Sequence, residues 1–459
     1  MSADDTISLT LRDLDQAAVT AWSQAHGDPD WLRARRLDAL ESLGKLERPA
    51  GREEAWRFTN PRRAGLDRHP ILSGARRGKT AGVEAEADDT AVLADLETGG
   101  LAVTIDGASA GTTLSKDLAD QGVLLTDLLT AARDHAGLVE PRFMTAAAPF
   151  DEDWFLALHA TVVSAGTFLY VPRGVEVALP IAALERRTRA GASFGHTLVV
   201  VEEGASLVFV QQHDSPATLD SNPRARAFHH AVAELFVGPR ARVQYLSLQE
   251  WGSEAVSHFG VQRAMVDRGA TYRSFVVTLG GGAVRLAPDA HLAEGAEADF
   301  LGAAFADEGQ QFEHRATVTH AEPHTRSTLL YKAGLLGGAR NIFNGTLNIA
   351  VGARGSDAAQ TMRNLVLSRH AHAEANPFLE ILNSDVRAAH AAATGRVDEQ
   401  HLFYLQSRGI PREEARRLVV FGFFEEVLAQ VTVPAVRRRL EAALEAELTQ
   451  ELRREEKAG

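Results

Sequence analysis

A turn containing glycine recurs through the middle of the chain, and this recurrence limits the folds that the chain can adopt. The turn occurs at Glu203-Gly204-Ala205, Gly238-Pro239-Arg240-Ala241, Arg268-Gly269-Ala270 and Glu294-Gly295-Ala296. Its glycines lie 26 to 34 residues apart, a spacing typical of solenoid repeats, in which each unit stacks its apolar side on the next. Glycine suits such corners because it accepts backbone conformations that other residues avoid.

The segments between these turns have the composition of strands. Val, Leu, Phe and Tyr dominate them, as expected of β-structure. They are residues 167–171, 198–201, 207–210, 235–237, 243–248 and 275–277. A β-sandwich is the competing interpretation, but sandwiches with tight hairpins use Asn-Gly or Asp-Gly turns. Between residues 155 and 385 the only such pair is Asn344-Gly345, so we favour a β-solenoid.

The pattern of the N-terminal part of the chain, to about residue 150, predicts helices and connecting segments. Asp28-Pro29 predicts a helix start, because a capping side chain precedes a proline at the first helical position. Gly44 predicts the end of that helix. Residues 75–100 are rich in Gly, Ala, Thr, Asp and Glu and predict a weakly packed linker.

The C-terminal part, from about residue 395, is expected to be helical. Leu440, Leu444, Leu448 and Leu452 form one apolar stripe on a segment otherwise rich in Glu and Arg. An earlier helix is expected to begin near Glu425-Glu426. These helices either cover the core or dock on a partner, and the sequence favours neither. We therefore expect three regions: residues 1–150, 151–393 and 394–459.

The absence of cysteine excludes whole classes of chemistry. The chain contains none, which rules out disulfides, a thiolate nucleophile and any Cys-ligated site built by this chain alone. The net charge of −13 argues against a general nucleic-acid binder. No apolar run approaches the roughly 20 residues of a membrane span, and MSADDTISLT lacks the pattern of a signal peptide. We expect a cytoplasmic protein.

Three histidines stand out among the 17 of the chain. His370 and His372 flank one alanine, so on a strand they would share a face and could converge on a metal; solvent-facing polar positions are the alternative. His390 lies in a run of alanines that leaves its imidazole accessible to a ligand or a partner. A core histidine with a satisfied hydrogen bond is the alternative, and the residues alone favour it.

Motifs of common enzymes are absent from the sequence. It contains no nucleophile elbow, Walker loop or dinucleotide fingerprint. Asp289, Asp299 and Asp307 are scattered in the expected solenoid, whereas a carbohydrate-processing β-helix needs carboxylates clustered on one face. Such an enzyme and a stand-alone His-based metal-binding protein remain the alternatives to a scaffold.

Long stretches of the chain resemble the SufB and SufD family of iron–sulfur cluster assembly proteins. They are EEAWRFTNPRR, PHTRSTLLYKAGLLGGARNIFNGTLNIAVGARGSDAAQ, RNLVLSRHAHAEANPFLEI and SDVRAAHAAATGRVDEQHLFYLQSRGI, and the resemblance spans about residues 52–430. It implies a mainly β fold, a central right-handed parallel β-helix flanked by N-terminal and C-terminal helical domains. Residues 394–399 resemble the SufD branch of the family. The absence of cysteine also favours this branch, because a resemblance to SufB would require cysteines.

The resemblance implies a scaffold without catalysis of its own. In the family, SufD pairs with SufB through their β-helices, and each binds a copy of the ATPase SufC through C-terminal helices. The complex builds a nascent iron–sulfur cluster, so the implied cofactor is a transient cluster or iron shared with SufB, with none held permanently by this chain. A homodimer in the absence of SufB is left open, as is flavin binding. Nucleic acid and membrane are not implied partners.

The resemblance also implies roles for particular residues. The family stretch Asp-Val-Lys-Cys-Ser-His-Gly matches residues 385–391, which makes His390 a candidate cluster ligand at the SufB interface. The family cysteine is replaced here by Ala388, and the glycine by Ala391, so sulfur handling by that cysteine cannot operate. The implied SufC-binding residues are Phe403, Tyr404, Arg408, Gly409, Phe421, Gly422, Phe423 and Glu426, although core packing is the favoured alternative for Phe403 and Tyr404.

Overall fold

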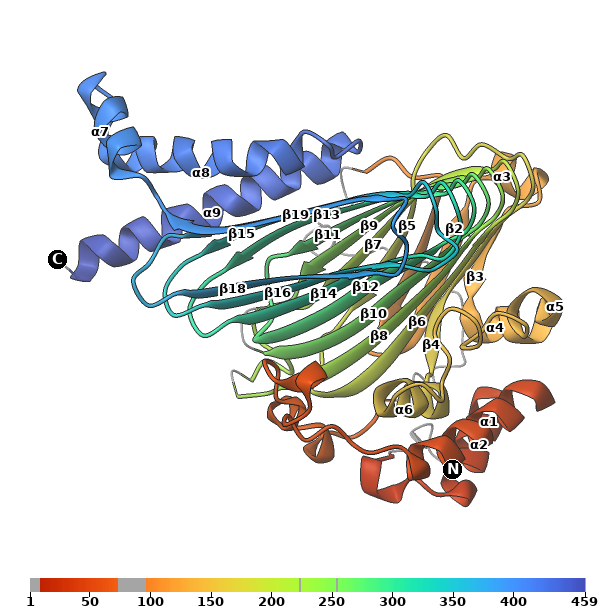
Figure 1. Ribbon diagram of the computed structural model, residues 1–459. Helices are drawn as coiled ribbons and strands as arrows, with labels where there is room; N and C mark the ends of the chain where they lie inside the picture. The colour runs from red at the N-terminus through yellow and green to blue at the C-terminus, as the bar shows by residue number, and fades with distance from the viewer. Residues whose placement is uncertain (1–8, 73–95, 223, 253–254, 459) are drawn as a thin grey trace.

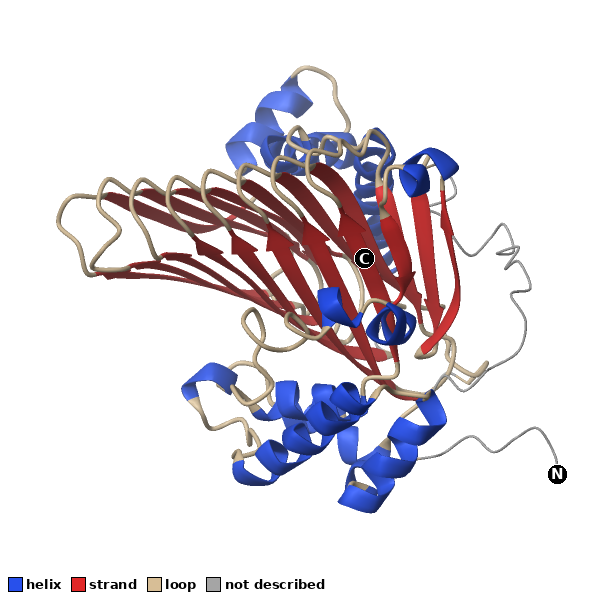
Figure 2. Cartoon of the chain, turned by 90° about the vertical axis from the view of Figure 1, so that its right-hand side faces the viewer, coloured by secondary structure: helices blue, strands red, loops and turns tan. Residues whose placement is uncertain are grey.

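The middle of the chain forms a parallel β-helix whose strands alternate between two sheets (Figures 1 and 2). The structure, a computed structural model, describes residues 9–72, 96–222, 224–252 and 255–458. Eight successive strand pairs, from β4 and β5 to β18 and β19, make eight turns of the β-helix. The predicted β-solenoid is confirmed, and the alternative prediction of a β-sandwich is wrong. Asn344-Gly345 lies inside a strand and forms no hairpin turn.

One sheet, sheet A, has nine strands. They are β3 (Leu124–Asp127), β4 (Ala165–Val171), β6 (Gly191–Val201), β8 (Ala227–Val237), β10 (Val256–Val266), β12 (Ala283–Leu292), β14 (Gln311–His320), β16 (Arg340–Ile349) and β18 (His372–Ile381). The other, sheet B, has ten: β1 (Gly100–Ile105), β2 (Ala108–Leu114), β5 (Ile181–Arg186), β7 (Ser206–Asp214), β9 (Arg242–Glu250), β11 (Thr271–Thr278), β13 (Glu297–Ala306), β15 (Arg326–Leu335), β17 (Asp357–Val366) and β19 (Arg387–Arg396).

One left-handed residue marks the same corner in successive turns of the β-helix. These residues are Gly174, Gly204, Arg240, Gly269, Gly295, His324 and Gly355. The backbone N–H of each donates to a carbonyl of the next turn, as Gly269 does to Glu294 at 2.9 Å. The predicted corners at Gly204, Gly269 and Gly295 are confirmed. In the third turn, however, Arg240 (φ 57°) takes the left-handed position, two residues after the predicted Gly238.

Apolar side chains from successive turns stack inside the β-helix. Phe209 of β7 pairs in register with Tyr245 of β9, so their rings stack with centroids 6.0 Å apart. Both side chains are buried, and each such burial stabilises the fold by about 2–3 kcal/mol. Parallel in-register pairing therefore places like residues above one another and fills the interior.

Most of the N-terminal helices lie on the outer face of sheet A near its first strands (Figure 1). They are α1 (Gln16–His26), α2 (Asp30–Lys45), α4 (Leu128–Asp134), α5 (Ala136–Val139) and α6 (Trp154–Val162). Helix α3 (Lys116–Asp120) instead follows β2, and its Leu118 packs into the interior core of the β-helix. Short 3-10 helices lie at Leu11–Asp13, Glu54–Trp56, Pro61–Ala64 and Leu66–Arg68. The helix predicted after Asp28-Pro29 is confirmed as α2. Asp28 does not cap it, because its carboxylate pairs with buried Arg36 at 2.6 Å.

Strands also occur before residue 150, where only helix and connector were expected. Asp106 and Gly107 both have positive φ and form a tight turn between β1 and β2, which pair antiparallel. Asp-Gly is a strong hairpin signal. β1 then pairs parallel with β5 and extends sheet B. Most of the predicted linker, residues 75–95, lies outside the described part of the chain.

The C-terminal helices α7 (Glu399–Ser407), α8 (Arg412–Leu428) and α9 (Pro434–Ala458) follow the last strand (Figure 1). Leu440, Leu444 and Leu448 of α9 are buried against α8 and the outer face of sheet B, so the predicted stripe is confirmed for them. The side chain of Leu452 lies outside the described residues. The prediction that a helix begins near Glu425 is wrong, because α8 begins at Arg412. None of the described helices has the length and apolar character needed to cross a membrane.

Candidate functional site

The β-helix ends at β18 and β19, and this open end carries His390. β18 pairs with β16 and β19 with β17, and within the described residues no further strand pairs with either. His390 lies on β19 opposite Gln360, with its side chain exposed. The prediction that His390 is a core residue, which the residues alone favoured, is therefore wrong. His390, the candidate ligand, is accessible at the open end.

Exposed apolar side chains accompany His390 at the open end. Phe378 is 52%, Ile381 42% and Leu382 58% exposed. Two adjacent strand edges offer unpaired backbone groups to a further chain, and apolar side chains favour covering them. Ala388 is partly buried and packs against the interior core. The open end thus has the features of an interface. The imidazole of His390 supplies the strongest metal-ligand atoms of β19.

The His370 and His372 pair does not form the expected strand face. His370 lies in the turn before β18, and only His372 is on the strand. His372 Nε2 lies 2.9 Å from the Glu374 carboxylate. Both histidines are exposed, which matches the alternative of solvent-facing polar positions.

The predicted partner-binding aromatics on α7 are exposed. Phe403 is 73% and Tyr404 56% exposed, so core packing is wrong for both. Arg408 lies over the Tyr404 ring at 5.1 Å. Gly409 ends this segment with φ at 86°, a conformation suited to glycine. α7 therefore presents an aromatic surface.

The predicted residues of α8 instead hold the helix on the β-helix. Glu426 pairs with Lys332 of β15 at 2.6 Å and with Arg363 of β17 at 3.4 Å. Lys332 also donates to the Phe423 carbonyl, and the hydrogen bond from Lys332 lowers the pKa of Glu426. Phe421 and Phe423 are half-buried and Gly422 is exposed. Their contacts anchor α8, while exposed surface remains beside them.

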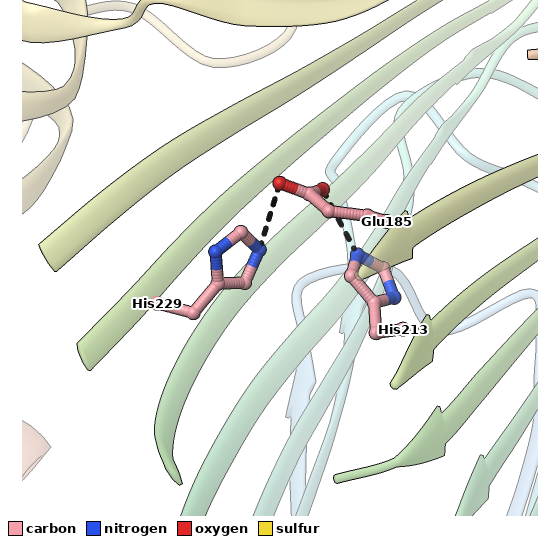
Figure 3. A group of neighbouring side chains, drawn as sticks. All are labelled: Glu185, His213 and His229. Carbon is pink, nitrogen blue, oxygen red and sulfur yellow. Dashed lines mark ion pairs between the residues drawn. The ribbon is translucent and has the colours of Figure 1, made fainter. Parts of the chain in front are cut away.

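A second group of polar side chains lies inside the β-helix, where the sequence analysis placed none. Glu185 of β5, His213 of β7 and His229 of β8 converge at the corner where strands of sheet B end and strands of sheet A begin (Figure 3). Glu185 Oε1 lies 3.4 Å from His229 Nε2, and Glu185 Oε2 lies 3.6 Å from His213 Nε2. One ligand atom from each residue lies within 4.8 Å of the others.

Neighbouring side chains orient these three residues. Ser193 Oγ lies 2.8 Å from His229 Nδ1, and the Gln249 amide nitrogen lies 3.1 Å from His213 Nδ1. The ring of His258 stacks on that of His229, with centroids 5.1 Å apart. Gly195 leaves room for the carboxylate, since a Cβ there would lie 2.1 Å from Glu185 Oε1.

Burial controls the protonation of this cluster. Removal from water would raise the pKa of Glu185, but the facing His229, His213 and Arg187 hold it below its usual value. Burial lowers the pKa of His213 to about 4, against the opposing effect of Glu185. His213 is therefore neutral near pH 7 and keeps a lone pair available for a cation.

Another buried histidine group lies on the outer side of β8. His159 of α6 contacts His230 at 3.0 Å and His196 at 3.3 Å. His196 in turn lies 3.1 Å from Glu234, which accepts the backbone N–H of Met144 and Ala148. This group connects α6 and the loop that precedes it to sheet A.

Three carboxylates of the solenoid, Asp289, Asp299 and Asp307, do not line one face. Asp289 lies on β12 in sheet A and Asp299 on β13 in sheet B, while Asp307 follows β13. Asp299 is paired with Arg273 at 3.0 Å. The clustering that a carbohydrate-processing β-helix requires is not formed by these three residues.

Comparisons with known proteins agree with this architecture. Residues 184–423 match the family described as "SUF system FeS cluster assembly, SufBD core domain", and residues 20–183 match "SufBD protein N-terminal region". The chain belongs to the SufBD family. The iron–sulfur cluster assembly protein SufD of Bacillus subtilis is 33% identical over 444 residues, covering 95% of this chain and 98% of the relative.

Mycobacterial members of the SufBD family are similar as well. An iron–sulfur cluster assembly SufBD family protein of Mycobacterium leprae is 33% identical over 428 residues, covering 91% of this chain and 95% of the relative. One from Mycobacterium tuberculosis H37Rv is 38% identical over 295 residues, or 62% and 72% of the two chains. The matched SufBD core contains both the open end with His390 and the buried cluster.

Sequence reasoning missed the buried cluster because its members are far apart in the chain. The available signal was chemical: Glu185, His213 and the pair His229-His230 are polar residues inside or at the end of apolar strand segments. Polar groups at such positions need a partner. Their convergence depends on which strands stack, which no single segment specifies.

Proposed function

We propose that this chain is the SufD-type subunit of a cytoplasmic iron–sulfur cluster assembly complex, in which it acts as a non-catalytic scaffold. It pairs with SufB at the open end of the β-helix and binds the ATPase SufC through its C-terminal helices. The observation that carries the proposal is the open end itself, where β18 and β19 present unpaired edges, apolar side chains and an exposed His390. Family membership supports the same assignment.

His390 contributes one nitrogen ligand to the cluster under assembly. Imidazole can replace thiolate at an iron of a cluster, whereas the side chain of Ala388 cannot bind metal. Thiolates therefore come from SufB, and the cluster is a transient cargo shared between the two subunits. In the absence of SufB, a second copy of this chain can cover the same edges, since a two-fold interface uses one surface twice.

The exposed aromatic surface of α7 supports SufC binding. The side chains of Phe403 and Tyr404 are largely exposed and are not packed in the core of their own chain. Exposed aromatic side chains are typical anchors of interfaces. The contacts of Glu426 with Lys332 and Arg363 fix α8 to sheet B. Movement of SufC during ATP turnover would therefore be passed to the strands that lead to the open end.

Co-expression tests this proposal. This chain, with an affinity tag, is produced with SufB and SufC candidates from the same organism, and iron and sulfide are measured in the purified complex. We expect wild type and His390→Ala to recover both partners, with less cluster in the variant. His291→Ala, which removes an exposed histidine from β12 far from the open end, is the matched control. It should retain the wild-type cluster content.

Two results would contradict different parts of the proposal. Failure to recover any SufC-like ATPase would overturn the scaffold assignment. Equal cluster content in His390→Ala and His291→Ala would remove His390 from the site while leaving the scaffold in place.

A further inference from the structure

We propose that Glu185, His213 and His229 bind one divalent first-row transition-metal ion inside the β-helix. This site is separate from the open end: its ligands come from β5, β7 and β8, near the start of the β-helix, whereas His390 lies on its last strand. The inference does not depend on the proposed partners, because all three ligands belong to this chain (Figure 3).

The separations between ligand atoms fit a metal ion. Bonds of about 2.0–2.2 Å in a tetrahedral arrangement place neighbouring ligand atoms roughly 3.4 Å apart. Glu185 Oε1 lies 3.4 Å from His229 Nε2, and Glu185 Oε2 lies 3.6 Å from His213 Nε2, so each separation is close to this value. Because two different oxygens are involved, binding through a single oxygen requires the carboxylate to rotate. A small movement of the two imidazoles toward each other would complete the coordination, because their ligand atoms already lie within 4.8 Å.

A hydrogen-bonded ion pair explains these distances less well. Charge-assisted hydrogen bonds between nitrogen and a carboxylate are about 2.7–2.9 Å long, well below the separations found here. Glu185 Oε1 and His229 Nε2 have no hydrogen-bond partner among the described residues, although both are buried. His229, His213 and Arg187 offset the cost of burying the charge of Glu185, but no described residue donates a hydrogen bond to its Oε1. A cation between the three side chains would satisfy it.

The surroundings prepare His229 for metal binding and require two adjustments at His213. Ser193 Oγ can accept the Nδ1 proton of His229 at 2.8 Å, which leaves the Nε2 lone pair facing Glu185. The Gln211 amide nitrogen lies 3.3 Å from His213 Nε2 and must release this atom before it binds a metal. When His213 Nε2 binds a metal, its Nδ1 carries a proton, so the Gln249 amide must turn its oxygen toward that atom. Trp251 now donates to that oxygen at 3.1 Å. The indole therefore exchanges partners on binding.

His258 is a further nitrogen donor beside the site. Its ring lies 5.1 Å from His229 and 5.3 Å from His213 between centroids, and neither of its ring nitrogens has a hydrogen-bond partner among the described residues. Arg187 adds positive charge beside Glu185. Its Nη2 donates to the carbonyls of Arg189 and Gly191, and its Nη1 lies 3.7 Å from the Asp106 carboxylate, which offsets part of that charge.

The donor set selects the class of metal. Two imidazoles and one carboxylate suit Fe²⁺, Co²⁺, Ni²⁺ or Zn²⁺, whereas Mg²⁺ and Ca²⁺ prefer oxygen ligands alone. The chain has no cysteine, so a soft thiolate site for Cu⁺ is excluded. Co²⁺ is the best probe, because its visible absorption reports coordination number and ligand type.

The test uses the full chain without partners. Protein is stripped with a chelator and titrated anaerobically with Co²⁺ and then with Fe²⁺, and binding is followed by absorption, calorimetry and the melting temperature. We expect one ion per chain and a higher melting temperature with metal. Glu185→Gln and His229→Gln should bind Co²⁺ at least about tenfold more weakly. His314→Gln, which alters a buried histidine of β14 outside the cluster, should bind as wild type does.

Diffraction at the cobalt edge makes the test independent of the variants. An anomalous peak between Glu185, His213 and His229 would support the site even if a variant failed to fold. Absence of one-to-one binding by wild type, or equal Co²⁺ affinity in folded Glu185→Gln and wild type, would overturn it. A peak only at exposed histidines such as His372 would do the same. None of these outcomes depends on cluster assembly, so failure here leaves the proposed function standing.

Discussion

Nε2 of His229 lies 3.4 Å from Oε1 of Glu185 inside the β-helix. On the other side of the same strand, His196 Nε2 lies 3.1 Å from Glu234, whose two oxygens also accept the N–H groups of Met144 and Ala148. Strand β8 thus separates two buried carboxylate–histidine groups. In the outer group both carboxylate oxygens accept backbone N–H groups, whereas in the inner group Glu185 Oε1 has no hydrogen-bond partner among the described residues. This difference distinguishes a structural group from a candidate binding site.

The space at Gly195 should control the inner group. A Cβ at this position would lie 2.1 Å from Glu185 Oε1, so Gly195→Ala must displace the carboxylate from the histidines. We expect Co²⁺ binding to fall at least about tenfold, as measured by calorimetry. Gly338→Ala is the matched control, since a Cβ there meets no atom within 4 Å. Unchanged Co²⁺ affinity in Gly195→Ala would show that Glu185 is not a ligand.

The outer group should contribute to stability. Glu234→Ala leaves two buried backbone N–H groups without acceptors and removes the partner of His196. We expect the free energy of unfolding to fall by about 3 kcal/mol or more, measured by denaturant titration. Glu297→Ala changes an exposed carboxylate on β13 and should alter stability by less than about 0.5 kcal/mol. Equal losses in the two variants would contradict a structural role for Glu234.

Buried histidines should make the protein sensitive to acid. Burial lowers the pKa of His314 to about 4, below its value of about 6.5 in the unfolded chain. Between these values the unfolded state binds more protons, so stability is complete above pH 6.5 and falls as the pH drops toward 4. The contribution is about 3 kcal/mol per histidine.

The melting temperature measured against pH tests this expectation. Several histidines share the behaviour: the pKa is lowered to about 4 for His213 and His320 and to about 3 for His230. His314→Gln should lose less stability than wild type between pH 6.5 and 4, because one group fewer takes up a proton. Parallel pH curves for the two proteins would show that His314 titrates normally.

The apolar edge of β18 should be needed for pairing with the partner scaffold. Phe378→Glu places a charge on a side chain that is 52% exposed, so we expect little loss of stability but at least about tenfold weaker association. Analytical ultracentrifugation of the purified subunits measures this. Val351→Glu, in a turn and 71% exposed, controls for added charge. If both variants associate as wild type does, the interface lies elsewhere.

The aromatic pair of α7 should bind the ATPase subunit. Phe403→Ala and Tyr404→Ala remove exposed rings, and we expect stability to change by less than about 0.5 kcal/mol. Binding of SufC, measured by calorimetry, should weaken about tenfold or more. Leu179→Ala removes an exposed apolar side chain elsewhere and should leave binding intact. Loss of binding in the control alone would place the ATPase on another surface.

Local sequence was informative where a structural feature is itself local. A left-handed corner needs a particular residue in one turn, so Gly204, Gly269 and Gly295 could be identified from the chain. The exception, Arg240, shows that neighbouring turns can impose the same conformation on a residue with a side chain, at some cost. The hairpin at Asp106-Gly107 carries an equally local signal, because an Asp-Gly pair between two strands favours a tight turn.

Exposure was poorly predicted from the sequence. Phe403 and Tyr404 are aromatic, and His390 is surrounded by alanines, so composition favoured the core for all three. The structure exposes them because α7 and β19 lie at the end of the molecule, where no later turn of the β-helix covers them. Position in the fold, rather than residue type, decides burial there.

The sequence by itself determined the repeated corners, the strand segments between them, the apolar stripe of α9 and the resemblance that led to the SufBD family. Only the tertiary structure brought Glu185, His213 and His229 together. The physical reason is that strands of successive turns lie about 4.8 Å apart, so residues remote in sequence meet once the turns stack. The same stacking stops at β19, and this end leaves His390 open to a partner.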